Sequence, residues 1–185
     1  MIIIGIDLDG VLSRSWETVF TPYHSETLYN KIRGSPGSTR KRIADLVVDE
    51  LFKEKWENWR GIHLLDNSIP EILRKFSTFA RIEIVTSTSG KEANIKKWLK
   101  ANGIPYNSII YSPPNDKWRH CDILIDNRSD VINEAVKHGK IGILLSKKNE
   151  FYGRAGNLFF ARDWNEVYEI VTSEATKLQG KMKTA

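Results

Sequence analysis

The first ten residues constrain the fold of this chain more than any other stretch. An apolar run over residues 2–6 leads directly into Asp7-Leu-Asp-Gly10. Side chains two apart in a strand point to the same face, so Asp7 and Asp9 converge where the strand stops. At roughly 4 Å and an effective dielectric of about 20, their repulsion is on the order of 4 kcal/mol. A cation or a shared proton must offset this repulsion, and either remedy indicates chemistry rather than an aspartate-rich turn.

Short apolar segments alternate with helical patterns along the rest of the chain. Capping residues predict helices that begin near Ser68, Lys91, Ser129 and Asp163, and Ser68 has the spacing of a capping box with Glu71. The predicted strands are residues 2–7, 82–86, 108–111, 123–126 and 141–145. Such alternation predicts the α/β class, with a parallel sheet covered by helices on both faces.

The alternation is interrupted once, because more than 50 residues separate the first strand from the helix at Ser68. Ordinary connections are far shorter, so we expect a small helical cap at residues 13–65. The cap would interrupt a core domain made of residues 1–12 and 66–178, followed by a flexible tail at 179–185. A helical pattern from 39 to 59 carries an aromatic stripe, Phe52, Trp56 and Trp59, which either packs inside the cap or lines a substrate pocket.

Composition narrows the class of protein. The chain has 185 residues with 41% hydrophobic content, which fits one globular domain with an insertion. No apolar run approaches the roughly 20 residues that cross a bilayer, and the amino terminus lacks a basic flank, so we expect a cytoplasmic protein without a membrane partner. The single Cys121 excludes an intramolecular disulfide and a cysteine zinc cluster. A net charge of +5 favours an anionic partner, although the basic tail from Lys177 to Lys183 inflates it.

Polar residues also stand at the ends of other predicted strands. Thr86 and Ser87 close the second strand, where hydroxyls and free amides before a helix would bind an anion. Asp126 ends the fourth strand, and Lys117 lies just upstream of it. Each residue alone has a plainer explanation as a cap, a turn or a surface lysine. Because the carboxyl ends of parallel strands share one crevice, we expect the aspartates to surround a divalent cation, with Thr86 and Lys117 near an anion.

In order and spacing, these residues resemble the haloacid dehalogenase-like (HAD) phosphohydrolases. The matching motifs are Asp7-Leu-Asp-Gly-Val11, Thr86-Ser87, Lys117, and Asp126 with Asp130. The resemblance implies a Rossmann-like sheet with a cap inserted after the first motif. Within the superfamily, residues 85–87 and 116–126 look like the 5′(3′)-deoxyribonucleotidases. Asn127 stands where that family usually has a second aspartate, and Asn115 stands where an arginine is expected.

The resemblance also implies catalytic and metal-binding roles. Asp7 would be the nucleophile that forms an aspartyl-phosphate, and Asp9 would protonate the leaving alcohol and then activate water. Mg²⁺ would be held by the carboxylates of Asp7 and Asp126, by the Asp9 carbonyl and by water. The expected phosphate-binding residues are Gly10, Thr86, Ser87 and Lys117. Asn127 and Asp130 would lie behind the metal ligands, where Asn127 can hold a metal-bound water.

Substrate choice would depend on the cap. Trp16 and Phe20 follow the first motif closely, and either ring could stack on a nucleobase, although Trp16 could equally anchor the cap to the core. The predicted function is a Mg²⁺-dependent phosphomonoesterase, with a (deoxy)nucleoside 5′-monophosphate as the expected substrate. Two alternatives stay open: another phosphate ester, such as a sugar phosphate or a nucleic-acid 3′-phosphate end, or a noncatalytic binding domain with the same fold. The sequence also leaves a homodimer open.

Overall fold

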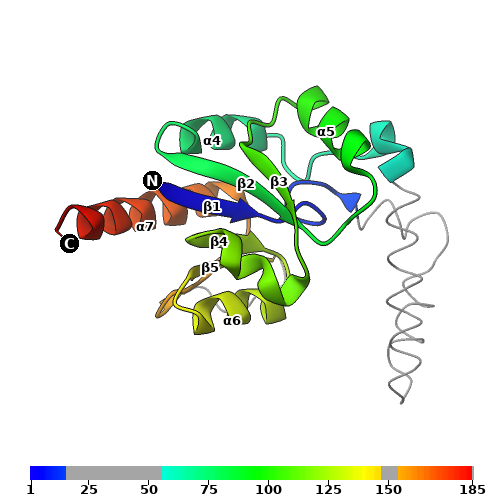
Figure 1. Cartoon of the computed structure of the whole chain (residues 1–185). Helices are drawn as coiled ribbons and strands as arrows, with labels where there is room; N and C mark the ends of the chain where they lie inside the picture. Colours follow the sequence, from blue (N-terminus) through cyan, green and yellow to red (C-terminus); the bar gives the residue numbers. More distant parts are fainter. Residues whose placement is uncertain (16–55, 147–153, 185) are drawn as a thin grey trace, which may run out of the picture.

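The five predicted strands lie side by side in one sheet in the computed structural model, which describes residues 1–15, 56–146 and 154–184 (Figure 1). Two further strands complete the sheet in the order β3-β2-β1-β4-β5-β7-β6. The strands are Ile2–Ile6 (β1), Ala80–Thr86 (β2), Ser108–Tyr111 (β3), Ile123–Asp126 (β4), Ile141–Leu145 (β5), Arg154–Ala155 (β6) and Leu158–Ala161 (β7). Neighbouring strands pair in parallel except for β6 and β7. The predicted parallel α/β fold is confirmed.

Helices cover both faces of this sheet (Figure 1). The face that carries Ile2, Ile4 and Ile6 packs against α4, α5 and α7 in the main hydrophobic core. The opposite face carries Leu124 and Leu144, which pack against α6. The helices are Ile69–Phe76 (α4), Glu92–Ala101 (α5), Ser129–Lys137 (α6) and Trp164–Thr184 (α7), with short 3₁₀ helices at Trp59–Gly61 (η1) and Pro114–His120 (η2).

Two helix starts show how local capping signals work in this chain. Asp163 caps α7 as predicted, because its Oδ1 accepts hydrogen bonds from two backbone N–H groups of the first turn, at 2.9 and 3.0 Å. The predicted capping box between Ser68 and Glu71 is wrong. Asp66 Oδ1 accepts hydrogen bonds from both the backbone N–H and the hydroxyl of Ser68, each at 2.8 Å. A carboxylate oxygen is a stronger hydrogen-bond acceptor than a hydroxyl oxygen. A turn held by the Asp66 side chain therefore replaces the predicted serine cap before α4.

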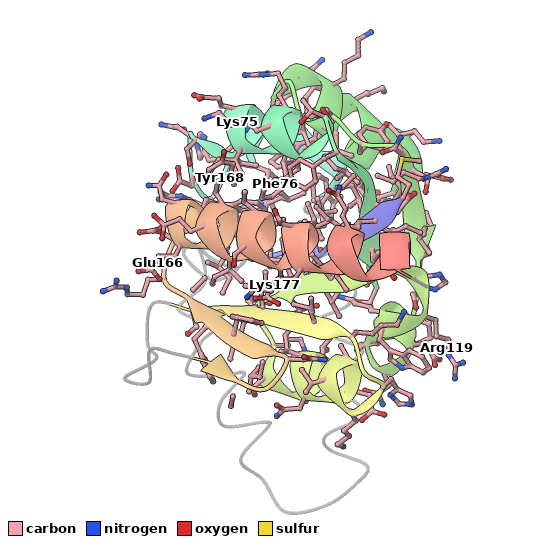
Figure 2. The ribbon with its side chains drawn as sticks, turned by 90° about the vertical axis from the view of Figure 1, so that its left-hand side faces the viewer. Lys75, Phe76, Arg119, Glu166, Tyr168 and Lys177 are labelled. Carbon is pink, nitrogen blue, oxygen red and sulfur yellow. The ribbon has the colours of Figure 1, made fainter. Side chains whose placement is uncertain are left out.

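The last helix is longer than the sequence suggested. Residues 179–184, expected as an irregular tail, are helical, because α7 continues to Thr184. Its buried positions include Val167, Val171 and Ala175, spaced four residues apart, so one stripe of the helix faces the core. Figure 2 shows α7 lying along the molecule beside Phe76 of α4, where Phe76 and Tyr168 stack with ring centroids 5.9 Å apart.

The sheet topology places β1 between β2 and β4, so the carboxyl ends of these three strands are adjacent. Asp7 extends the ladder beyond β1 by donating its backbone N–H to the carbonyl of Ile125 at 3.0 Å. Within β1, a Cβ placed on Gly5 would lie 2.8 Å from the Cys121 sulfur. The absence of a side chain at Gly5 therefore lets the segment after η2 approach the sheet closely.

The two stretches that flank residues 16–55 lie side by side. Ser13 forms an antiparallel bridge with Leu64, and the backbone N–H of Leu65 donates to the carbonyl of Leu12 at 2.8 Å. The segment therefore leaves and rejoins the core through adjacent residues.

Several predictions for the cap lie outside the described residues. These are residues 39–55 of the helix predicted over 39–59 and the side chains of Trp16, Phe20 and Phe52. Across the described ranges, we find no helix with the length and hydropathy that a bilayer span requires.

Candidate active site

Lys117 links the carboxyl ends of β1 and β4. Its Nζ donates hydrogen bonds to Asp7 Oδ1 at 2.7 Å and to Asp126 Oδ2 at 2.8 Å. The three side chains are almost inaccessible, with exposed fractions of 2% for Lys117, 8% for Asp7 and 0% for Asp126. Asp7 follows β1, Asp126 ends β4, and Lys117 reaches both from η2. The structure thus brings three of the predicted site residues into direct contact.

The charges in this cluster are not balanced. Burial raises the pKa of Asp126 to about 6, and the nearby Asp7 charge adds to the effect. Burial also raises the pKa of Asp7. For Lys117, burial alone would lower the pKa, but the carboxylates of Asp7 and Asp126 hold it above its usual value. Lys117 is therefore charged, and ionising both acids leaves an excess negative charge that a further cation would offset.

Asp9 lies in the turn after β1 and is held at both oxygens. Trp56 Nε1 donates a hydrogen bond to Oδ1 at 3.2 Å, and the Thr88 hydroxyl donates to Oδ2 at 2.6 Å. Burial raises the pKa of Asp9, whereas hydrogen bonds from Thr88, Ser15 and Trp56 act in the opposite direction. A carboxyl group with a raised pKa can carry a proton nearer to neutral pH, which suits proton transfer.

The loop after β2 reaches the same edge. Thr86 is buried and its Oγ1 accepts a hydrogen bond from the backbone N–H of Thr88 at 3.1 Å, whereas Ser87 is exposed. Gly10 has φ of 84°, a left-handed conformation that strongly favours glycine, and its backbone N–H donates to the Ser13 carbonyl at 2.9 Å. Together these turns bring the ends of β1 and β2 next to each other.

This arrangement can be compared with known proteins. No protein-family model and no curated protein matches the sequence. Solved structures do match its fold. A haloacid dehalogenase-like family hydrolase from Streptococcus pneumoniae aligns over 92% of this chain and 98% of that chain, with 16% identity and a TM-score of 0.58. A HAD hydrolase from Bacillus subtilis, bound to magnesium, aligns over 91% and 97%, with 12% identity and a TM-score of 0.58.

A third structure shows the chemical range of these neighbours. An L-2-haloacid dehalogenase aligns over 92% of this chain and 99% of that chain, with 11% identity and a TM-score of 0.59. The chain has the HAD-like fold. At these identities the likeness concerns the fold alone, so the chemistry must be argued from the residues at the edge of the sheet.

The chemistry of Asp7 and Asp126 suits a magnesium ion. Mg²⁺ is commonly held by one or two carboxylates, with water and substrate oxygens completing its six ligands. Asp7 and Asp126 supply two such carboxylates, and the excess negative charge of their cluster is of the sign that a cation would offset. Among the described residues, no group of three or more His, Cys, Asp or Glu side chains could hold a metal. The third protein ligand expected here is a backbone carbonyl, that of Asp9.

The remaining predicted residues stand around this cluster. Asp126 Oδ1 accepts a hydrogen bond from the backbone N–H of Arg128 at 2.9 Å, which orients the carboxylate. Asn127 lies between these two residues and is partly exposed. Asp130 lies in the first turn of α6 and is 60% exposed, with Oδ2 paired to Arg128 NH2 at 2.6 Å. The ion pair with Arg128 thus ties Asp130 to the loop that follows Asp126.

Trp56 and Thr88 contact Asp9, and sequence reasoning assigned neither of them to the site. Thr88 carried a signal, because it lies two residues beyond Thr86 in a run of hydroxyl side chains. Trp56 carried a weaker one, as a member of the aromatic stripe that was expected to pack in the cap or line a pocket. It is fully buried, yet its indole N–H reaches a carboxylate 47 positions away in the chain.

Proposed function

We propose that this chain is a Mg²⁺-dependent phosphomonoesterase that acts through an aspartyl-phosphate. One observation carries the proposal: Asp7 lies beside a buried ammonium and a second carboxylate, while Asp9, two residues later, is held separately by neutral donors. The two acids of one short motif therefore have different surroundings. Different surroundings suit different tasks, with one acid as nucleophile and the other as proton donor.

In the first step, an Asp7 oxygen attacks phosphorus while the ester P–O bond breaks. The electron pair of that bond goes to the leaving oxygen, which takes the proton carried by Asp9. In the second step, water attacks the phosphoaspartate and gives a proton back to Asp9. Inorganic phosphate leaves and the Asp7 carboxylate is restored, so atoms and protons balance over the cycle.

Lys117 and the backbone near Gly10 and Ser87 would make the site suitable for an anionic substrate. Asp126 would contribute by helping to hold the metal. Lys117 holds Asp7 in place through its 2.7 Å hydrogen bond and keeps that carboxylate ionised. When bound to Asp7, Asp126 and the Asp9 carbonyl, Mg²⁺ would lower the repulsion between an anionic nucleophile and an anionic phosphate. Thr86, Ser87 and the backbone amides near Ser87 and Gly10 would face the phosphate oxygens.

Asp9 favours phosphate esters over haloacids as substrates. A halide ion leaves without needing a proton, whereas an alkoxide is a poor leaving group unless an acid protonates it. Asp9 has a raised pKa and sits within reach of the same edge as Asp7. A dehalogenase would have no use for such a group, so the shared fold does not imply a shared reaction.

A nucleoside 5′-monophosphate is the substrate we propose. Support comes from the resemblance of residues 85–87 and 116–126 to deoxyribonucleotidases and from Trp16 and Phe20, whose rings could stack on a base. Asn127 and Asn115 depart from that pattern, so sugar phosphates and 3′-phosphorylated nucleic-acid ends are retained as second candidates.

A phosphate-release panel tests this function. It would contain nucleoside 5′- and 3′-monophosphates, sugar phosphates, a 3′-phosphorylated oligonucleotide and p-nitrophenyl phosphate, each with Mg²⁺ and with chelator. We expect Mg²⁺-dependent release, strongest for a nucleoside 5′-monophosphate. Release from no ester would favour a noncatalytic binding domain.

Substitution of the nucleophile tests the mechanism. We expect Asp7→Asn to lower kcat to under about 1% of wild type, since a nucleophile cannot be replaced by an amide. Its melting temperature should be unchanged or higher, because the substitution removes repulsion between buried acids. Asp116→Asn is the matched control: this exposed carboxylate precedes Lys117 and pairs with Arg119. Residual turnover of more than a few per cent in Asp7→Asn would contradict the covalent mechanism.

A further inference from the structure

We propose that Trp56 is a positioning residue for Asp9, which sets the direction in which the acid delivers its proton. The inference rests on the phosphomonoesterase function proposed above. Its starting point is a single contact: Trp56 Nε1 lies 3.2 Å from Asp9 Oδ1, and the indole is fully buried. A buried indole N–H needs an acceptor, and here the acceptor is one oxygen of the proposed general acid.

Packing holds the Trp56 ring in place. Trp98 of α5 meets it edge to face, with ring centroids 5.7 Å apart and an interplanar angle of 89°. Trp98 is itself fixed, because its Nε1 donates to the Ile62 carbonyl at 2.8 Å. Next to Trp56, Glu57 forms an ion pair with Lys91 at 2.5 Å, at the start of α5. Trp56 is therefore a rigid donor, anchored to a helix of the core.

The chemistry of the two donors explains why Trp56 would orient Asp9. An indole N–H can only donate, so Oδ1 is kept as an acceptor. The Thr88 hydroxyl at Oδ2 can donate to a carboxylate and accept from a carboxylic acid, so it suits both forms of Asp9. With Oδ1 held by Trp56 and Oδ2 held by Thr88, the plane of the carboxyl group is fixed throughout the reaction. Catalytic groups need orientation within narrow limits, and loss of the Trp56 bond removes one of these two restraints.

Trp56 also connects Asp9 to the segment inserted after β1. It is the first described residue after positions 16–55, and it belongs to the stretch that returns to the core.

The experiment compares leaving groups. The substitution Trp56→Phe keeps an aromatic ring against Trp98 but removes the indole N–H that donates to Asp9. The best alkyl ester from the phosphate-release panel needs its leaving alkoxide protonated, whereas the nitrophenolate of p-nitrophenyl phosphate leaves without help. Since a positioned general acid contributes roughly 100-fold or more, we expect Trp56→Phe to lose about 10-fold in kcat/KM, which reports the steps up to release of the leaving group, on the alkyl ester and under about 2-fold on p-nitrophenyl phosphate.

Two further variants make the comparison specific. Asp9→Asn should show the same selectivity for the leaving group, with a larger loss. Trp164→Phe is the matched control, because it removes a fully buried indole N–H that donates to the Val11 carbonyl and does not contact Asp9. We expect it to lower the melting temperature while leaving the ratio of the two kcat/KM values unchanged.

The outcomes separate the two proposals. If the wild-type protein hydrolyses neither ester, the proposed function fails. If it hydrolyses both and Trp56→Phe lowers kcat/KM equally for the two esters, the positioning role is overturned and the function stands.

Should Trp56→Phe fail to fold, indole N–H resonances from NMR supply the test. Asp9→Asn should shift the assigned Trp56 signal and leave that of Trp98 in place. An unmoved Trp56 signal would contradict the proposal.

Discussion

Lys117 is the residue on which the charge of the site depends. It carries one positive charge between two carboxylates, and none of the three side chains is more than 8% exposed. Removing one partner of a buried ion pair is far more costly than removing an exposed one, because the remaining charges lose both water and partner. The residue therefore has a structural task as well as the phosphate contact that we propose for it.

We expect Lys117→Met to destabilise the protein by about 3 kcal/mol or more at pH 8, because two buried carboxylates lose their ammonium. Urea unfolding in the presence of chelator measures this loss. Lys137→Met is the control, since Lys137 is 70% exposed and pairs with Glu134 on the surface of α6. Equal stability of the two variants would mean that the buried cluster does not contribute as described.

Helices and strands of this fold approach each other closely where one of them carries a glycine. Gly142 of β5 faces α6, and a Cβ built there would lie 2.7 Å from Ile132 Cγ2 and 3.2 Å from the Ile132 carbonyl oxygen. The oxygen belongs to the helix backbone, so α6 would have to move as a unit to make room.

Gly142→Ala should therefore destabilise the fold by about 1–3 kcal/mol, the usual cost of overpacking a core. Thermal and urea unfolding would measure the change. Gly61→Ala provides the comparison, because no atom lies within 4 Å of a Cβ at that position. If both variants unfold alike, the contact between β5 and α6 is looser than the distances indicate.

Sequence patterns identified those strands and helices that the local spacing of apolar residues encodes. Strands β1 to β5 were predictable because each is a short apolar run bounded by polar residues. β7 was missed, although Leu158–Ala161 is an apolar run as long as β3 and β4; its place depends on pairing with β5. The cap at Ser68 was predicted wrongly, since the backbone N–H and the hydroxyl of Ser68 both donate to Asp66.

The whole molecule brings its acids together at one edge of the sheet, and this couples its stability to the binding of protons. In the folded protein burial raises the pKa of Asp126 from 3.8 to about 6. The folded state then binds this proton more tightly than the unfolded state. The resulting stabilisation is complete below about pH 4 and is lost as the pH rises through 6.

We expect metal-free wild-type protein to lose stability relative to Asp126→Asn as the pH rises from about 4 to above 6. Added Mg²⁺ at pH 7.5 should raise the melting temperature of the wild type and have little effect on the variant, because the metal binds the folded state. Calorimetry with Mg²⁺ and with chelator measures both effects. A rise of equal size in both proteins would contradict the proposed metal ligands.

The site was predictable where the backbone alone decides it. Asp7 and Asp126 meet at Lys117 because the carboxyl ends of parallel strands share one edge, whereas Asp9 lies in the turn after β1, beyond the two-residue period of the strand. The contact of Trp56 with Asp9 was not predictable, because it depends on how the chain returns after a long insertion. No local pattern encodes a contact of that kind.

The bridge between Ser13 and Leu64 holds the two attachment points of the inserted segment next to each other. Exchanging residues 16–55 for those of another protein of the same fold should thus be a modular operation, because the described hydrogen bonds of the sheet lie outside this stretch. Such a graft would alter which molecules enter while the reaction itself persists. The boundary is narrow, however: a graft extended by one residue would take the tryptophan that holds the acid.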